Sequence, residues 1–312
     1  MKRIIFMGTT EFGIPTLRAF SEHHDVPAVV TRPDTTKGRG RKLLPSPIKV
    51  AAQELGIEVI EAGNMKDPAF IDRLKALEAD IFYVAAFRIL PKEVFTLPPD
   101  GTINLHGSLL PDYRGAAPIN HAVINGDTTT GLTTFYIEES IDTGDIILNK
   151  PLTIGPDETA GELASRLMVA GEELSLKTVS MIERGGAFGL KQPTAGCRPA
   201  PKLHKVDGRI DWTRDARSIH NQVRGMNPAP GAFTGWKNGP LKIHRTELIE
   251  ESTGVEPGRI LVASPREGIT VSCGKGQLRI LELQPPCKKA MDGPCFVRGY
   301  RVESGTVLPV DQ

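Results

Sequence analysis

Residues 4–22, IIFMGTTEFGIPTLRAFSE, contain the pattern that decides the fold. The apolar residues 4–7 predict a buried strand, a glycine turn follows, and residues 11–22 have the periodicity of a helix. Further strand patterns alternate with helical ones, the strands at residues 26–31, 57–61, 80–85, 102–106 and 132–137, the helices at 68–77, 118–125 and 159–184. This alternation is typical of βαβ units and predicts a mostly parallel sheet, which binds ligands beyond the carboxyl ends of its strands.

The character of the sequence changes in its last third. Residues 192–201, QPTAGCRPAP, have the proline and glycine content of a linker. Beyond it, one helical pattern is followed by short β patterns that glycine and proline interrupt, at residues 216–224, 241–244, 258–263, 269–272 and 277–283. Such a pattern favours a small β-barrel. We therefore predict an α/β catalytic domain over residues 1–188, a linker over 189–203 and a β-barrel domain over 204–312.

The composition excludes several classes of protein. Hydrophobic residues make up 39% of the 312 and charged residues 24%, which excludes a disordered, collagen-like or coiled-coil chain. The longest apolar run at the N-terminus is shorter than the roughly seven residues of the shortest signal peptide core, so we expect a cytoplasmic protein without a membrane partner. No Cys-x-x-Cys pair occurs among the four cysteines, and we expect free thiols and no metal site.

The first glycine turn does not fit a nicotinamide site. In residues 8–13, GTTEFG, Thr10 replaces the second glycine that lets a pyrophosphate approach the backbone. No acidic residue ends the second predicted strand, where Val30, Thr31 and Arg32 stand. We interpret this turn as a structural strand-to-helix connection, whose helix N-terminus retains the capacity to hold an anionic group.

A second stretch, residues 102–108 with the sequence TINLHGS, is more informative. Asn104 and His106 alternate with apolar residues, so both polar side chains lie on one face of a strand end. An amide and an imidazole side by side can hold a carbonyl oxygen as it becomes an oxyanion. The irregular residues that follow, 107–115, are the kind of loop in which sheet enzymes keep ligand contacts.

Asp142 lies 36 residues after His106, in a turn before a strand pattern. A carboxylate at this point can orient His106, raise its pKa or relay a proton through water. Taken singly, each of the three residues is more often structural: a buried, hydrogen-bonded histidine, a turn asparagine or an Asx turn. Spacing alone leaves both alternatives open.

Two stretches carry an excess of positive charge. Residues 31–50 contain six basic residues and one acidic residue, and residues 191–224 contain eight basic and three acidic residues. Such runs are usually solvated faces. The formal net charge of the whole chain is only +1, with −3 on residues 1–203 and +4 on residues 204–312. Two basic runs beside an acidic first part favour an RNA partner, since a flexible basic segment can follow a phosphate backbone.

Two motifs, residues 104–115 (NLHGSLLPDYRG) and 141–146 (IDTGDI), resemble those of the 10-formyltetrahydrofolate-dependent formyltransferases. Other segments resemble, more closely, the members that formylate the methionine carried by initiator tRNA: residues 4–9, 37–42, 44–47, 209–212, 227–232 and 288–291. The resemblance extends over nearly the whole chain. It implies a Rossmann-like N-terminal domain, a C-terminal OB-like barrel that binds tRNA, and 10-formyltetrahydrofolate as the co-substrate, without a metal.

The resemblance also implies a role for each motif residue. Asn104 and His106 correspond to the pair that polarises the formyl carbonyl, and Asp142 to the carboxylate that pairs with the histidine and helps to move protons. Folate contacts are implied for Ser108, Leu109, Leu110, Pro111, Phe87 and Arg88, although the last two belong to a stretch, residues 85–91, that stands where many relatives carry Ala-Tyr-Gly before Leu-Pro. Contacts with methionyl initiator tRNA are implied for Lys37, Arg39, Arg41, Lys42, Lys205 and Arg209.

Three alternatives remain open from the sequence. An amino-sugar nucleotide formyltransferase would share the catalytic trio and differ in the acceptor, but the basic loop and the positive C-terminal part count against it. A folate hydrolase would pass the formyl group to water. A catalytically silent RNA-binding module would not need Asn104, His106 and Asp142 together. We expect the chain to act as a monomer.

Overall fold

The computed structural model describes residues 1–37, 42–186, 189–193, 196–237, 239–249 and 254–309. The chain divides into two compact units, and neither is continuous in sequence. The first unit contains Met1–Pro118, Thr130–Thr153 and Ala164–Ala200, and the second contains Ile119–Thr129, Ile154–Leu163 and Pro201–Gln312. Within the described residues, no helix has the length and apolar content that crossing a membrane requires.

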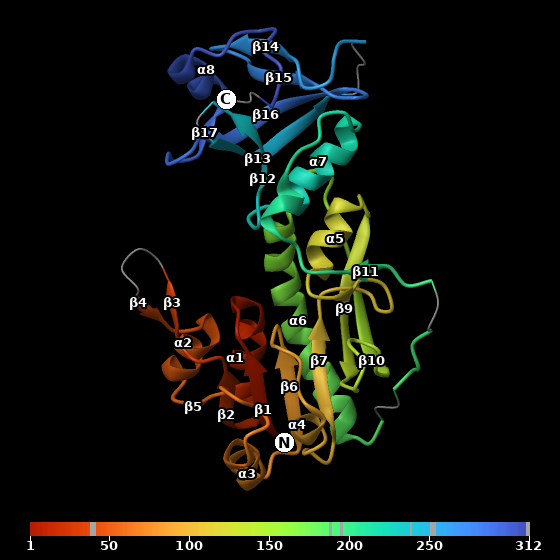
Figure 1. Cartoon of the computed structure of the whole chain (residues 1–312). Coiled ribbons are helices and arrows are strands. Elements are labelled where there is room, and N and C mark those ends of the chain that lie inside the picture. Colours follow the sequence, from red (N-terminus) through yellow and green to blue (C-terminus); the bar gives the residue numbers. More distant parts are fainter. Residues whose placement is uncertain (38–41, 187–188, 194–195, 238, 250–253, 310–312) are drawn as a thin grey trace. The chain divides into compact units, whose positions relative to one another are not determined.

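The elements of residues 1–200 alternate as the sequence predicts (Figure 1). In chain order they are β1 (Arg3–Gly8), α1 (Ile14–His23), β2 (Asp25–Thr31), β3 (Thr35–Lys37), β4 (Lys42–Leu44), α2 (Pro47–Glu54), β5 (Glu58–Glu61), α3 (Pro68–Ala76), β6 (Ile81–Ala85), α4 (Lys92–Phe95), β7 (Thr102–His106), β8 (Arg114–Gly115), α5 (Pro118–Ile124), β9 (Thr129–Tyr136), β10 (Ile146–Thr153), α6 (Ala160–Glu183) and β11 (Pro199–Ala200). The strand pattern that the sequence shows after the Asp142 turn is β10. The sequence did not predict α2 or α4, because short helices carry too few residues for a clear period.

The main sheet of the first unit has seven strands in the order β10-β9-β7-β6-β1-β2-β5. Strand β1 pairs in parallel with β2 and β6, and β6 pairs in parallel with β7. Strand β9 runs antiparallel to β7. The chain builds outward from β1 to β5 and then returns to β6 on the other side, so the order reverses between β1 and β6. The predicted α/β fold is therefore confirmed, and ligands of such sheets bind at this reversal, beyond the carboxyl ends of the strands.

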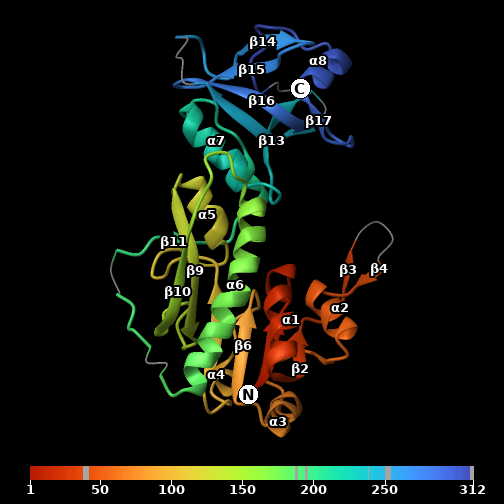
Figure 2. The same ribbon diagram turned by 180° about the vertical axis from the view of Figure 1, so that it is seen from behind.

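Helices cover both faces of this sheet. Helices α1 and α6 lie on the face turned to the viewer in Figure 2. On this face the buried Tyr83 hydroxyl of β6 donates to Ser175 Oγ of α6 at 2.6 Å, and the Thr16 hydroxyl of α1 lies 3.4 Å from the same oxygen. Burial raises the pKa of Tyr83, which keeps its hydroxyl a donor. On the other face, Leu74 of α3 and Val94 of α4 join the apolar cluster of β1, β2 and β6. Burial on both faces explains why these strands read as continuous apolar runs.

The second unit has a six-stranded antiparallel sheet around its own core. Its elements beyond residue 200 are α7 (Ala216–Gly225), β12 (Ala232–Trp236), β13 (Gly239–Ile249), β14 (Ile260–Ser264), β15 (Gly268–Ser272), β16 (Gln277–Gln284), β17 (Met291–Asp292) and α8 (Gly293–Tyr300). The strand order is β12-β13-β16-β15-β14, with β17 beside β16. Trp212, Ile219 of α7 and Phe296 of α8 belong to one buried cluster. The predicted β-rich C-terminal fold is confirmed.

Hydrogen bonds to backbone carbonyl oxygens tie residues 119–129 and 154–163 to the second unit. The Asn120 side-chain amide donates to Gly225 O at 2.8 Å, and Gly161 N donates to Asn227 O at 3.0 Å. The Arg224 guanidinium, which is 6% exposed, donates to the carbonyl oxygens of Gly155 and Glu158. A boundary based on composition cannot detect such pairings, because they join segments distant in the sequence.

A capping box at the start of α6 makes the stability of the second unit depend on pH. Glu162 accepts hydrogen bonds from the backbone and hydroxyl of Thr159, both at 2.9 Å, and pairs with Arg245. The hydrogen bonds from Thr159 and then from Arg245 lower the pKa of Glu162 from 4.5 to about 2. A lowered pKa in the folded state means that this stabilisation is complete above pH 4.5 and is lost as the pH falls through about 2.

We therefore expect Glu162→Gln to lower the melting temperature at neutral pH, and to lower it far less at pH 2. Calorimetry at several pH values measures the difference, which should shrink as the pH falls from about 4.5 to about 2. Glu267→Gln, at an exposed position of the same unit, is the matched control. A difference between wild type and Glu162→Gln that does not change with pH would contradict this assignment.

Candidate active site

The carboxyl end of β7 presents the two polar residues that the sequence singles out. Asn104 and His106 are two residues apart on this strand, so both side chains lie on one face. Asn104 is half-buried, and its side-chain amide makes no hydrogen bond to the part of the chain that the structure describes. His106 is 5% exposed and its ring packs edge-on against Phe135 of β9. The strand therefore presents one amide without a described partner beside one fixed imidazole.

A hydrogen bond to the backbone sets the orientation of the imidazole. His106 Nε2 lies 2.9 Å from the carbonyl oxygen of Tyr113. A carbonyl oxygen can only accept, so Nε2 carries a proton and donates it to this bond. In the neutral ring Nδ1 then has a free lone pair. Nδ1 is thus the nitrogen of His106 that can exchange a proton with another group.

The structure brings Asp142 to this nitrogen, which spacing alone could not establish. Asp142 Oδ2 lies 3.8 Å from His106 Nδ1 and accepts a hydrogen bond from Gly115 N at 2.8 Å. The carboxylate is directed at another loop rather than at its own backbone, so it does not form the Asx turn that was the structural alternative. Asp142 has a φ of 53°, a left-handed conformation that aspartate and asparagine tolerate better than most residues.

The loop between β7 and β8 is held by two hydroxyl groups, one from the loop and one from β9. The Ser108 hydroxyl is buried and donates to Asp112 O at 2.6 Å. Thr133 of β9 donates to Ser108 O at 2.7 Å and accepts from Leu110 N at 3.0 Å. Ser108 and Leu110 are therefore engaged within the loop, while Leu109 and Pro111 are half-buried. Sequence reasoning did not assign roles to Tyr113 O and Gly115 N, since backbone groups carry no signal in a single sequence.

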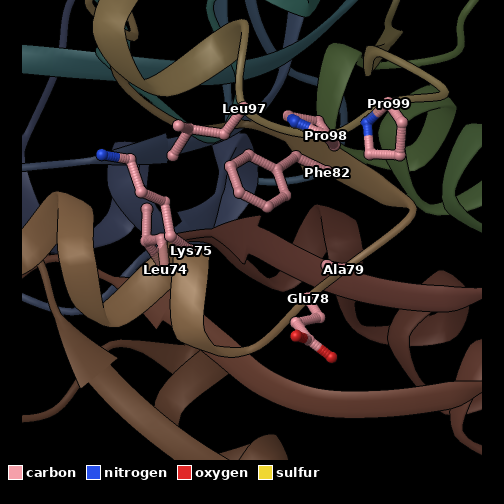
Figure 3. Close-up of a pocket in the computed structure, with 8 residues that line it drawn as sticks. All are labelled: Leu74, Lys75, Glu78, Ala79, Phe82, Leu97, Pro98 and Pro99. Atoms are coloured by element: carbon pink, nitrogen blue, oxygen red, sulfur yellow. The ribbon is translucent and has the colours of Figure 1, made fainter.

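A cavity elsewhere in the first unit does not belong to this site. It has a volume of about 250 Å³ and is lined by residues of α3, the connection from α3 to β6, β6 and the segment before β7: Leu74, Lys75, Glu78, Ala79, Phe82, Leu97, Pro98 and Pro99 (Figure 3). Phe82 is the second residue of β6, and residues 97–99 precede β7. Strands β6 and β7 are parallel, so the cavity lies at their amino ends and His106 at the opposite edge.

Comparison with known proteins identifies the family. The formyl transferase model matches residues 2–179, and the model of the formyl transferase C-terminal domain matches residues 202–301. The chain belongs to the formyl transferase family. The first match covers more than half of the chain and contains the whole Asn104, His106 and Asp142 constellation.

Relatives of similar length are methionyl-tRNA formyltransferases. The enzyme of Porphyromonas gingivalis is 44% identical over 312 residues, with 97% of each chain covered. The enzyme of Geobacter sulfurreducens is 45% identical over 308 residues, which cover 98% of this chain and 96% of the relative. These formyl transferases match both units.

Solved structures share the fold of this formyl transferase at low identity. An N-formyltransferase from Helicobacter canadensis, in complex with folinic acid and dTDP-3-aminofucose, has a TM-score of 0.68 at 22% identity, covering 89% of this chain and 98% of its own. HypX from Aquifex aeolicus, in complex with tetrahydrofolic acid, has a TM-score of 0.64 at 16% identity, covering 99% of this chain and 51% of its own. At these identities the likeness concerns the fold alone.

Phe87 and Arg88 lie at the same edge of the formyl transferase sheet as His106. They follow β6, whose last residue Ala85 pairs with Leu105 of β7. Phe87 packs on the core cluster of the first unit, and the Arg88 guanidinium donates to the carbonyl oxygens of Ala62 and Gly63. Both side chains therefore have structural partners, and their contact with folate stays a prediction.

The basic residues predicted to contact tRNA are placed only in part. Strands β3 and β4 form a hairpin in which Lys37 pairs with Lys42, while Arg39 and Arg41 lie outside the described residues. In the second unit, Lys205 and Arg209 are exposed, at a short 3-10 helix and just after it.

The arrangement at the end of β7 supports two kinds of chemistry. The Asn104 amide can donate to an oxygen that gains negative charge, and Asp142 with the His106 ring can accept and return a proton. Formyl transfer from a folate to an amine needs both a donor to the developing oxyanion and a group that moves a proton.

The described residues contain no group of three or more His, Cys, Asp or Glu side chains able to hold a metal ion.

Proposed function

We propose that this chain transfers the formyl group of 10-formyltetrahydrofolate to the α-amine of methionine esterified to initiator tRNA. The observation that carries the proposal is the Asn104, His106 and Asp142 constellation at the end of β7, in a chain 44% and 45% identical to two methionyl-tRNA formyltransferases over nearly its whole length. Because the acceptor is an aminoacyl-tRNA, we expect the enzyme to act in the cytoplasm.

In the proposed reaction, the α-amine attacks the formyl carbon bound to N10 of the folate, forming a C–N bond and placing the electron pair on the formyl oxygen. The Asn104 amide donates to this oxyanion, and a protonated His106 Nδ1 adds a second donor. Asp142 takes a proton from the attacking amine and delivers one to N10, directly or through His106. The C–N10 bond then breaks, releasing tetrahydrofolate and formylmethionyl-tRNA.

The remaining predicted residues complete the proposal. Residues 108–111 with Phe87 and Arg88 would contact the folate, because they surround the carboxyl ends of β6 and β7. The basic hairpin of β3 and β4, together with Lys205 and Arg209, would contact the tRNA through its phosphates. The boundaries 1–188, 189–203 and 204–312 remain our proposal for the catalytic domain, linker and tRNA-binding domain.

A comparison of acceptors tests this function. Formyl transfer from 10-formyltetrahydrofolate is measured with methionyl initiator tRNA, methionyl elongator tRNA and a dTDP-amino sugar in parallel. Transfer to the initiator alone supports the proposal. Transfer to the sugar, or release of formate only, would keep the chemistry of the site and refute the assigned acceptor. Binding of tRNA without any turnover would refute catalysis.

Neutralising the basic hairpin should weaken tRNA binding without affecting the folate. We expect Arg39→Gln with Lys42→Gln to raise the dissociation constant for tRNA. The slope of its salt dependence should fall by about one for each phosphate that the variant no longer neutralises. Binding titrations at several salt concentrations measure both. The control is Arg73→Gln with Lys75→Gln on α3, which removes the same charge elsewhere. An unchanged slope in the hairpin variant would make these residues a solvated face.

A further inference from the structure

The segment that the sequence predicts as a linker lies along two loops of the active site: the loop between β7 and β8, and the loop before β10 that carries Asp142. Its described residues, 189–193 and 196–200, all belong to the first unit, and we refer to them as the strap. At one end, Leu190 exchanges two backbone hydrogen bonds of 2.8 Å with Ile146. Gly189 lies so close to Asp145 that an added Cβ would come within 2.4 Å of that side chain. The strap is thus packed against the loop that carries Asp142.

Gln192 joins the two loops through the nitrogen and the oxygen of its side-chain amide. Its amide nitrogen donates to the carbonyl oxygens of Asp142 at 3.1 Å and Gly144 at 2.7 Å. Its amide oxygen accepts from Arg114 Nε at 3.1 Å and from a terminal nitrogen of Arg114 at 2.7 Å. The next residue, Gly115, donates its backbone N–H to the Asp142 carboxylate. Gln192 therefore holds the backbone of the Asp142 loop on one side of the contact that orients this carboxylate, and the Arg114 side chain on the other.

The other end of the strap holds the loop that orients His106. Pro199 and Ala200 pair with Arg114 and Gly115 as strands β11 and β8. Arg198 O accepts from Tyr113 N at 2.6 Å, and Tyr113 O in turn accepts from His106 Nε2.

The Arg198 side chain adds two further contacts with the same loop. Its guanidinium binds Asp112 Oδ2 at 2.8 and 3.1 Å, and it lies 4.4 Å from the centre of the Tyr113 ring. The hydrogen bond from Arg198 also lowers the pKa of Asp112, which keeps that carboxylate charged. Both members of the His106–Asp142 pair are thus reached from one segment.

We propose that the strap positions the catalytic pair, and that Gln192 is the positioning residue for Asp142. The expected effect on catalysis rests on the proposed function, whereas the expected effect on the Asp142 loop does not. Asp142 has a left-handed backbone and reaches His106 across 3.8 Å, so a small shift of its loop changes the distance over which a proton moves. Glutamine suits this position because it supplies two donors for the carbonyls and an acceptor for Arg114.

Two variants of Gln192 separate positioning from general damage. Gln192→Ala removes every contact, whereas Gln192→Glu keeps an acceptor for Arg114 but has no donor for the two carbonyls. We expect both to lower kcat for formyl transfer by about 10- to 100-fold, because a misplacement of about 1 Å costs up to that much. The KM values for folate and tRNA should stay within about threefold, because Gln192 touches neither in the proposed complex. The control is Leu190→Ala, in the same segment, whose side chain is 71% exposed.

Hydrogen exchange measures the structural part without any substrate. Amides of residues 139–146 should exchange faster in both Gln192 variants than in wild type and in Leu190→Ala. Unchanged exchange, or faster exchange with wild-type kcat, would overturn the proposal, as would a fully active Gln192→Glu. If the wild-type chain does not formylate methionyl-tRNA, the proposed function fails, while the exchange data still decide whether the strap holds the Asp142 loop.

Discussion

Asp142→Asn is expected to lower kcat for formyl transfer by about 10² to 10⁴, the usual range for removing a group that moves protons. Asparagine tolerates the left-handed backbone of this position, where φ is 53°, and its amide oxygen can still accept from Gly115 N. The substitution therefore removes the charge and the basicity while keeping the shape. Steady-state kinetics with each substrate varied in turn would measure the loss, and the dissociation constant for tRNA should stay within about threefold.

The matched control for this variant is Asp72→Asn. Asp72 lies on α3 with a side chain that is 72% exposed, and it pairs only with Lys75 among the contacts that the structure describes. We expect its kinetics to equal those of wild type. A kcat for Asp142→Asn within about threefold of wild type would remove Asp142 from the proton transfer and leave it as a support for Gly115.

Asn104→Ala should produce the second large effect, a loss of about 10² to 10³ in kcat, equivalent to about 2.7–4 kcal/mol of transition-state stabilisation. The Asn104 amide is half-buried at the end of β7, and it has no hydrogen-bond partner in the described parts of the chain. It is therefore free to bind an oxygen of the substrate. Because the interaction strengthens as charge develops, kcat should fall while KM for the folate changes little.

The control for Asn104→Ala is Asn149→Ala. Asn149 lies in β10 of the same sheet with an exposed side chain, so the substitution has the same size and a similar strand setting. Thermal unfolding of both variants would show that the fold is kept. A variant Asn104→Ala that raised only KM would assign this residue to ground-state binding and would contradict its role as an oxyanion donor.

The structure adds two observations to the domain organisation that the sequence predicts. The proline and glycine content of residues 192–201 indicates the absence of regular structure and is typical of a linker. In the structure, Gln192 contacts the Asp142 loop and Arg198 contacts the loop between β7 and β8. Composition reports which backbone conformations are accessible, but it does not report which partners the side chains meet. The units are also discontinuous, because contacts between segments distant in the sequence group residues 119–129 and 154–163 with the C-terminal part.

The sequence by itself determined the alternation of strands with helices, the mostly parallel sheet, and the placing of Asn104 and His106 on one face at the end of β7. These features follow from local periods of two and 3.6 residues, which depend only on near neighbours along the chain. Only the tertiary structure decided that Asp142 reaches His106 and that Gln192 reaches the Asp142 loop. Such contacts join residues 36 and 50 positions apart, and their geometry is set by the packing of the sheet and its loops rather than by any repeating pattern in the sequence.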